Sequence, residues 1–319
     1  MSAATTILML SVDEAHLLRH SLAAAAAQLG ARLLVIDNAC QDATRDVAAE
    51  HGARVLSLRP RRSYAAAINA GILATETDAV LLLNADCVLD EGFLEAARPR
   101  LSQRGVGSVA PRLLRATGMD AGDRLDRLDA AGMVVDPRRK NTLVGHDAPA
   151  SDYGQAAEVF GADGACVLYR REVLEACAVG GEVLDEDFEL WASDVDLAWR
   201  TRLLGWRCIY EPRAVAWHVR FYSPTTRSGL PAAHRRLQFR NRLLMMAKND
   251  AWPDLRGDLH RIAFYELLAL GHVLLRERHL LRAYRDVLRQ LPAARRRRRV
   301  VQAKRPRGVK APFGLRAPP

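Results

Sequence analysis

The stretch that decides the fold is Arg32–Thr44, which reads RLLVIDNACQDAT. Four consecutive apolar residues lead directly into Asp37 and Asn38, and a more polar segment follows. A short apolar run that ends in polar residues is typical of a buried strand whose carboxyl end opens into a loop. The pattern therefore predicts a strand over Arg32–Ile36 and then a helix over Asp42–His51, which Gly52 ends.

The same alternation continues on both sides of this stretch. Three more strands are predicted, at Thr6–Leu10, Arg54–Leu58 and Ala79–Leu83. Helices are predicted after the first strand, with Asp13 as N-cap, and at Tyr64–Ala74. Apolar strands separated by helices indicate βαβ units, so the fold class is α/β with a mainly parallel sheet covered on both faces.

Polar side chains gather where three of these strands end. They are Ser11, Asp13, Asp37, Asn38, Asn84 and Asp86. Ligands of open α/β sheets bind in the crevice outside the carboxyl ends of the strands, so a binding site is expected there. The chain has no G-x-G-x-x-G after the first strand and no G-x-x-x-x-G-K-[ST], which disfavours dinucleotide and P-loop sites.

The second half of the chain is less regular. Residues 118–155 are polar and lack periodicity, which predicts a long excursion over the surface. Order returns at Glu158, and an apolar strand pair is expected at Cys208–Tyr210 and Ala214–His218. After Pro224 the pattern is helical to about Leu291, where Pro292 and a run of arginines are expected to end it.

Six blocks of the chain, in order, resemble family 2 glycosyltransferases. The blocks are LLVIDNACQDAT, SYAAAINAGI, LLLNADCVLDEGFL, FGADGACVLYRREVLE, LDEDFELWASDVDLAWRTRLLGW and AVAWH. A later segment, RRLQFRNRLLMMAKND, resembles the helical region of the rhamnosyltransferase-like branch of that family. The resemblance implies the GT-A fold, in which a nucleotide-sugar-binding α/β half is joined to an acceptor-binding half.

This resemblance implies a division of the chain into three parts. Residues 1–222 are expected to form the GT-A catalytic domain, with residues 1–115 as the nucleotide-sugar half and 116–222 as the acceptor half. A helical region at 223–291 and a basic, disordered tail at 292–319 are expected to follow.

The resemblance also assigns donor-binding roles to four residues. Asp37 would accept hydrogen bonds from the nucleotide base, since a carboxylate is an acceptor-only group, although capping of the next helix is the alternative. Asn69 and Asn84 match further donor-site positions. Asp86 would bind a divalent cation, Mg²⁺ or Mn²⁺, on the diphosphate, and His218 matches a position that often completes the metal site. The family often has D-x-D here, whereas this chain has Asn84-Ala85-Asp86.

Inverting transfer needs a general base that takes the proton from the acceptor hydroxyl. In the family this base is the aspartate of an E-D-x-D-L helix start, and the present chain reads Ser193-Asp194-Val195-Asp196-Leu197. Asp194 matches the base, Ser193 replaces the glutamate, and Ser193 is itself a suitable N-cap. Two alternatives remain: Asp196 as the base, or both carboxylates merely filling the first turn of a helix.

The net charge of +10 lies at the C-terminus. Ten basic residues and no acidic ones follow Leu291, and the rest of the chain is neutral. Ile262–Leu275 is apolar but contains Glu266 and His272, so it is too short and too polar to span a bilayer. An arginine-rich amphipathic stretch follows, which suits an anionic membrane surface. A helical cap packed on the catalytic domain is the alternative.

The sequence as a whole predicts an inverting glycosyltransferase. The expected donor is a UDP- or dTDP-activated sugar, with rhamnose favoured by the branch resemblance alone, and the expected acceptor is a lipid-linked or cell-envelope saccharide. Five cysteines without a C-x-x-C pair fit a reducing compartment, so the expected location is cytoplasmic, on the inner face of the cell membrane. The alternatives are a nucleotidyltransferase, or a non-catalytic saccharide- or nucleic-acid-binding protein, although the neutral body makes nucleic acid an unlikely partner.

Overall fold

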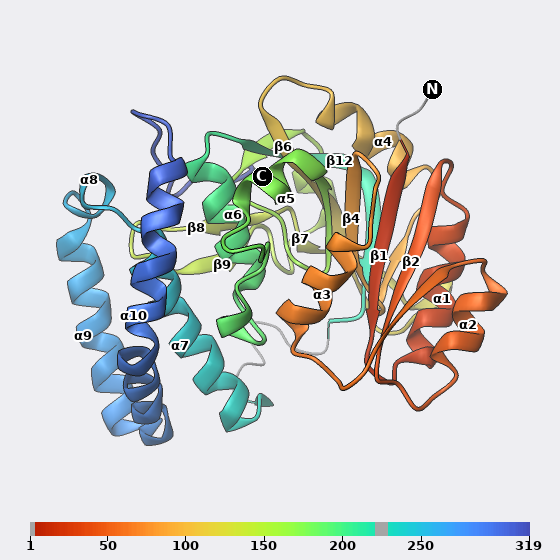
Figure 1. The fold of residues 1–319 in the computed structure, drawn as a ribbon. Helices are drawn as coiled ribbons and strands as arrows, with labels where there is room; N and C mark the ends of the chain where they lie inside the picture. Colours follow the sequence, from red (N-terminus) through yellow and green to blue (C-terminus); the bar gives the residue numbers. More distant parts are fainter. Residues whose placement is uncertain (1–3, 221–228) are drawn as a thin grey trace.

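A computed structural model describes residues 4–220 and 229–319 (Figure 1). Its main element in these ranges is a ten-stranded mixed sheet in which eight strands follow the order β10-β12-β6-β11-β4-β1-β2-β3. The parallel part consists of β1 (Thr5–Ser11), β2 (Ala31–Asn38), β3 (Arg54–Leu58) and β4 (Ala79–Asn84). The predicted α/β class with a mainly parallel strand arrangement in this half is therefore confirmed.

Helices cover both faces of this sheet. One face buries apolar residues of α1 (Ala15–Ala26), α2 (Thr44–Glu50) and α4 (Phe93–Leu101). The other face buries residues of α3 (Tyr64–Leu73) and α5 (Arg171–Cys177). Strands β1, β2 and β4 are enclosed between these two cores, which explains why each reads as an uninterrupted apolar run.

The prediction that Asp13 caps the first helix is wrong. Asp13 has a left-handed φ of 61°, and α1 begins at Ala15 after Glu14. The first backbone N–H of α1 is instead satisfied by Asp42, whose Oδ2 accepts from the Ala15 nitrogen at 2.8 Å. The cap thus comes from the neighbouring strand-end loop, a tertiary contact that local sequence does not encode.

The middle of the chain is also more ordered than predicted. The supposed surface excursion contains β7 (Arg124–Ala130), paired with β6 (Val106–Ala116), and a small sheet of β8 (Met133–Val135) and β9 (Asn141–Leu143). The expected strand pair after it is one strand, β12 (Arg207–His218), with an irregular register between Glu211 and Val215.

The remaining strands complete the same sheet. They are β5 (Cys87–Leu89), β10 (Ala157–Val159) and β11 (Cys166–Arg170). β11 runs antiparallel to both β4 and β6, and β12 runs parallel to β6. It follows that β12 points the same way as β4, so its last residue, His218, lies at the same edge of the sheet as Asn84.

Helices dominate the chain after residue 228. They are α7 (Ala232–Asn249), α8 (Trp252–Leu255), α9 (Leu259–Leu275), the short η5 (Arg278–Leu280) and α10 (Leu281–Lys304). α10 packs along α7, and α9 forms the outer edge of the molecule in Figure 1. No helix within the described ranges is both long and apolar enough to cross a membrane. The predicted C-terminal helical region is confirmed.

The prediction that residues 292–319 form a disordered tail is wrong. α10 continues through Pro292 to Lys304, and the segment after it returns to the protein core. There the Phe313 ring lies 5.1 Å from Trp199 and 6.0 Å from Phe160, while the Arg139 guanidinium stacks on its face at 3.7 Å. Aromatic packing and a cation–π contact order this segment in spite of its composition.

We predict that Phe313→Ala will lower the free energy of unfolding by about 2–3 kcal/mol, because it removes a half-buried ring from a packed aromatic cluster. Urea denaturation followed by circular dichroism measures this loss. Arg307→Ala, at an exposed position of the same segment, serves as the control and should change stability by less than about 0.5 kcal/mol. Equal stabilities of the two variants would contradict the packed segment.

Candidate active site

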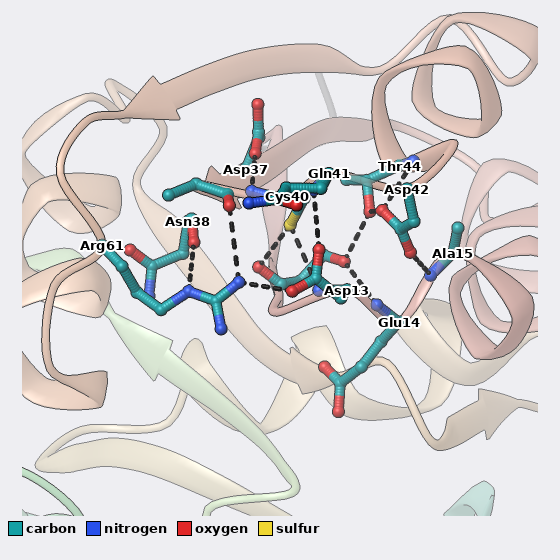
Figure 2. Close-up of polar contacts among 12 residues, drawn as sticks. Asp13, Glu14, Ala15, Asp37, Asn38, Cys40, Gln41, Asp42, Thr44 and Arg61 are labelled. Carbon is teal, nitrogen blue, oxygen red and sulfur yellow. Dashed lines mark hydrogen bonds and ion pairs between the residues drawn. The ribbon is translucent and has the colours of Figure 1, made fainter.

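The ends of β1 and β2 meet in a network of polar contacts (Figure 2). Asp13 accepts a hydrogen bond from the Gln41 backbone nitrogen at 2.7 Å and pairs with Arg61. Arg61 also donates to the Asn38 carbonyl oxygen at 3.2 Å. These contacts hold the two strand-end loops together beside the edge where ligands of such sheets bind.

Asp37 lies at the end of β2 with its carboxylate fully buried. It accepts from the Cys40 nitrogen at 2.8 Å, from Arg45 at 2.6 Å and from both terminal nitrogens of Arg59, at 3.3 and 3.1 Å. Burial alone would raise the pKa of this carboxyl, but hydrogen bonds from Arg59 and Arg45 hold it well below its usual range. Asp37 is therefore an ionised acceptor that stabilises the turn after β2.

Asp86 and His218 lie together, as the sequence predicted. Oδ1 of Asp86 is 3.4 Å from Nε2 of His218, and this buried oxygen makes no hydrogen bond. On its other side, Nδ1 of His218 lies 2.8 Å from Oδ2 of the fully buried Asp129. Burial would lower the pKa of His218, but the hydrogen bond to Asp129 and the negative charge of the facing Asp86 raise it to about 10. The imidazole is therefore held between two carboxylates.

Arg220 continues this network toward a second part of the site. It donates to both carboxylate oxygens of Asp129, at 2.7 and 2.8 Å, and to Oδ2 of Asp163 at 2.7 Å. One guanidinium therefore joins β7, which carries Asp129, to the loop before β11, which carries Asp163. Such planar, charge-assisted contacts fix the orientation of all three groups.

Asp194 stands in the first turn of α6 (Ser193–Leu203), directly after an unusual turn. Glu189, Trp191 and Ala192 all have left-handed φ values, of 61°, 70° and 62°. Non-glycine residues adopt this conformation at a cost, and such residues cluster at functional sites. The expected N-cap, Ser193, is instead the first residue of the helix; its hydroxyl is buried without a hydrogen bond, and Ala192 occupies the N-cap position.

The surroundings of Asp194 keep its carboxylate less acidic than usual. Burial, and then the negative charge of Asp163, raise its pKa to about 6, although the backbone nitrogens of Val195 and Gly164 donate to it at 2.8 and 3.2 Å. A carboxylate that titrates near neutral pH is suited to take and return a proton. Tyr64, at the start of α3, lies near the same carboxylates. Burial and the negative charges of Asp194, Asp163 and Asp86 raise the pKa of its phenol.

Asp196, the alternative base, has a structural role. Its buried carboxylate contacts Lys248 at 2.8 Å, Arg200 at 2.9 Å and Asn249 at 2.8 Å. Burial opposes ionisation, but the positive charges of Lys248 and Arg200 lower the pKa of this group. Asp196 thus joins α6 to α7, and both of its carboxylate oxygens are occupied by these contacts.

A cleft of about 620 Å³ opens beside Asp194. Its polar end is lined by Asp163, Asp194 and Arg220, and Trp191 contributes to the same wall. The rest of the cleft lies between β8, β9, α7 and α9. Asp194 is therefore open to a bound molecule, whereas Asp196 is not among the lining residues.

Two predicted donor-site residues have less support. Asn69 donates from Nδ2 to the Leu184 carbonyl at 2.8 Å and accepts from the Leu184 nitrogen at 2.8 Å. Both of its polar groups thus serve a contact between α3 and the loop that leads to α6, and its role in donor binding stays a prediction. Asn84 ends β4, where its backbone nitrogen donates to the Ala165 carbonyl at 2.9 Å.

Asp13, Cys40 and Asp42 form a second cluster of possible metal ligands, with ligand atoms within 4.8 Å of one another. Each of them already has a structural partner: Asp42 accepts from Thr44 and Ala15, and Asp13 accepts from Gln41 and Arg61. Cys40 donates from its thiol to the Ser11 carbonyl at 3.1 Å. These contacts explain the cluster without a cation.

Sequence reasoning missed four residues of the site: Tyr64, Asp129, Asp163 and Arg220. Asp163 and Tyr64 lie within quoted blocks, FGADGACVLYRREVLE and SYAAAINAGI, but were not singled out. Asp129 lies in the segment that was read as an irregular excursion, and the apolar run Ala130–Val135 after it was the available signal of a buried strand. Arg220 follows the AVAWH block by two residues.

The sequence pattern of glycosyl transferase family 2 matches residues 6–177, more than half of the chain. The chain therefore belongs to glycosyl transferase family 2, a family of glycosyltransferases.

Two mycobacterial relatives match parts of the chain. An uncharacterized glycosyltransferase of Mycobacterium tuberculosis is 42% identical over 91 residues, which are 28% of this chain and 40% of the relative. The pre-mycofactocin glycosyltransferase of the same species is 29% identical over 192 residues, which are 59% of this chain and 37% of the relative. The matches thus span about two fifths of the length of these relatives.

Solved structures confirm the GT-A fold. A mannosyltransferase from Pyrobaculum calidifontis, solved with GDP-mannose and Mn²⁺, has a TM-score of 0.56 and 16% identity, over 95% of this chain and 86% of that one. TarS of S. aureus, residues 1–349, solved with UDP-GlcNAc, has a TM-score of 0.61 and 13% identity, over 94% of this chain and 90% of that one. At these identities the likeness concerns the fold.

We predict that Asp163→Asn will move the acidic limb of the pH profile of kcat/KM to lower pH by about one unit. Removing the negative charge of Asp163 favours the ionised form of Asp194, so the pKa of Asp194 falls and its carboxylate is available to accept a proton at lower pH. Asp126→Asn, at an exposed position of β7, serves as the control and should leave the limb in place. An acidic limb that remains at the wild-type pH, or that moves to higher pH, in Asp163→Asn would contradict this electrostatic coupling.

Proposed function

We propose that the protein is an inverting glycosyltransferase that uses Asp194 as general base. The observation that carries this proposal is the position of Asp194 in the wall of the cleft, with a pKa raised to about 6. In the transfer, the acceptor oxygen bonds to the anomeric carbon while the bond from that carbon to the diphosphate oxygen breaks. The acceptor proton goes to the Asp194 carboxylate, and the nucleoside diphosphate leaves with the bonding electrons.

The residues at the end of β4 fit a divalent cation. Oδ1 of Asp86 is buried with no hydrogen bond, and Nε2 of His218 faces it at 3.4 Å. Asp129 binds the other ring nitrogen, as the carboxylate partners of metal-binding histidines do, and so presents Nε2 to the site. We therefore propose Asp86 and His218 as ligands of Mg²⁺ or Mn²⁺. A cation would take the place of the proton that Nε2 of His218 carries beside Asp86, because a ligating imidazole must be neutral. When bound, such a cation neutralises charge on the leaving diphosphate.

The donor half is proposed to lie over the ends of β1 and β2. The carboxylate of Asp37 is ionised there, and Arg45 and Arg59 beside it are 57% and 44% exposed. These two guanidiniums offer donors to an anionic nucleotide, and Asp37 orients them. A UDP- or dTDP-sugar remains the proposed donor, with rhamnose as one candidate sugar and a cell-envelope or lipid-linked saccharide as the acceptor.

We further propose that the protein binds an anionic membrane surface at its C-terminal helices. Of the basic residues after Leu291, Arg297, Arg298 and Arg305 bind acidic or carbonyl groups of the body. α9, in contrast, exposes several large apolar side chains, and exposed arginines follow it. The exposed apolar side chains are Leu259, Phe264, Leu267, Leu270, Leu274 and Leu275. The exposed arginines are Arg276, Arg278, Arg282, Arg285 and Arg289. An apolar helix face with a basic rim suits the interface of an anionic bilayer.

We predict that Asp194→Asn will reduce transfer by about 10²–10⁴-fold, the usual contribution of a general base. A screen of nucleotide sugars with Mn²⁺ by thermal shift first identifies the donor, since a bound donor stabilises the native state. The variant should keep the thermal shift of the wild-type protein, because Asp194 lies on the acceptor side. Asp196→Asn is an unsuitable control because it disrupts a buried ion cluster, so Asp126→Asn is used. Transfer above a tenth of the wild-type rate in Asp194→Asn would refute the assignment.

We predict that replacing both Leu267 and Leu275 by Gln, at side chains 65% and 79% exposed, will weaken binding to phosphatidylglycerol vesicles at least tenfold. Cosedimentation measures the binding, and raised salt should weaken it further by screening the arginines. Leu73→Gln, on α3 and 87% exposed, is the matched control and should bind as the wild type does. Unchanged binding by the double variant would rule out α9 as the membrane-facing helix.

A further inference from the structure

The cleft beside Asp194 has two unlike parts. Around Asp194, Asp163 and Arg220 it is lined by charged groups that belong to the start of α6, the loop before β11 and the end of β12. Farther along, most of the lining is apolar and comes from α7, α9 and η5, although Gln238, Arg242, Tyr265 and His272 of α7 and α9 also line it. The apolar members are Phe239, Met245, Leu268, Ala269, Val273 and Leu280. A binding site with this division suits a molecule with a polar head and an apolar arm.

The apolar wall offers little to a sugar. Leu268, Ala269 and Val273 of α9 carry no side-chain donor or acceptor, whereas saccharide hydroxyls need hydrogen-bond partners when they leave water. Polar side chains lie across from them, on the β9 side, where Lys140, Asn141 and Thr142 line the cleft. Apart from Tyr265 and His272, the α9 wall therefore suits hydrocarbon, and the polar groups on the β9 side are left for the head of the bound molecule.

The apolar part of the cleft also reaches the surface of the molecule. Leu268 lines the cleft and yet is 57% exposed, and its neighbour Leu267 is 65% exposed on the outer side of α9. The cleft wall and the exposed apolar face thus belong to the same helix. A chain that leaves the cleft past Leu268 arrives at the face that we propose to lie on the membrane.

We propose that the acceptor is an amphiphile whose hydrocarbon chain lies along α9, between Leu268, Ala269 and Val273, while its attacking hydroxyl lies at Asp194. This inference rests on the proposed function and names the chemical class of its acceptor. It assigns α9 a role in selecting the acceptor by its chain, and it explains why a glycosyltransferase domain carries an exposed apolar helix next to its base.

The experiment measures binding of hexyl, octyl and decyl maltosides, below their critical micelle concentrations, by isothermal titration calorimetry. Each buried methylene contributes about 0.8 kcal/mol, which corresponds to about fourfold in affinity, and a half-open cleft should retain at least twofold per methylene. The wild-type protein should therefore bind the decyl compound at least tenfold more tightly than the hexyl compound, with one site per chain.

Two variants test the location of the chain. Ala269→Trp fills the apolar part of the cleft, and Leu268→Gln makes its exit polar at a position exposed enough to fold normally. Both should abolish most of the gain with chain length. Leu275→Trp, on the same helix but outside the cleft, should keep it. An equal gain in all three variants, or no gain in the wild-type protein, would overturn the proposal.

Titration of UDP with Mn²⁺ in the same samples keeps this result separate from the proposed function. Retained UDP binding in Ala269→Trp and Leu268→Gln shows that each variant is folded and that its donor half is intact. Failure of the wild-type protein to bind UDP or any nucleotide sugar would refute the proposed transfer. The maltoside series would still report on the cleft, because it needs no donor.

Discussion

The side-chain amide of Asn241 is the contact on which the active site depends. From α7 its nitrogen donates to three backbone carbonyls of the turn before Asp194, those of Phe188 and Leu190 at 2.8 Å and that of Trp191 at 3.0 Å. The turn contains three left-handed, non-glycine residues, each of which costs on the order of 1–3 kcal/mol. One buried amide thus holds a strained loop in the conformation that brings Asp194 to the cleft.

This contact explains why the C-terminal helices belong to the catalytic unit. Arg240, next to Asn241, supports the same loop by donating to the Asp187 and Phe188 carbonyls at 2.9 and 3.2 Å. The buried pair of Lys248 with Asp185, and that of Lys248 with Asp196, lock α7 to both ends of the segment. α10 in turn packs along α7. The basic C-terminal part of the chain therefore supports the loop that carries Asp194, the proposed base, and is also the proposed membrane surface.

A second set of contacts connects the proposed cation site with the proposed base. Asp129 orients His218 on the donor side, and through Arg220 it also fixes Asp163, whose charge raises the pKa of Asp194. The proposed cation site and the proposed base are thus connected by four side chains, which come from β7, β12, the segment after β12 and the loop before β11. Because of this connection, a shift of Asp86 or His218 in the proposed cation site would also change the surroundings of Asp194.

The sequence predicted the parts of the protein that depend on local pattern. The predicted strand Arg54–Leu58 has the bounds of β3, and Asp86 and His218 lie together at strand ends. Both predictions succeeded because apolar runs and the polar residues that end them can be recognised from local sequence. Contacts between distant segments could not be predicted from local sequence. The cap of α1 comes from Asp42 in another loop, and Asp129, which contacts His218, lies in a segment without a regular pattern. The arginine run looked disordered, but Arg297 meets Glu182 and Asp185, and Phe313 meets Trp199. Ion pairs and aromatic packing with the rest of the protein therefore order this segment, although its composition predicts disorder.

A crystal structure with UDP and Mn²⁺, with the metal located by its anomalous scattering, tests the proposed site most directly. We expect one peak that is coordinated by Asp86 and His218 and by the diphosphate, with Asp194 open to the acceptor cleft beyond it. A peak at Asp13, Cys40 and Asp42 instead, or a diphosphate bound away from Asp86, would contradict the arrangement of donor, cation and base on which the proposed function rests.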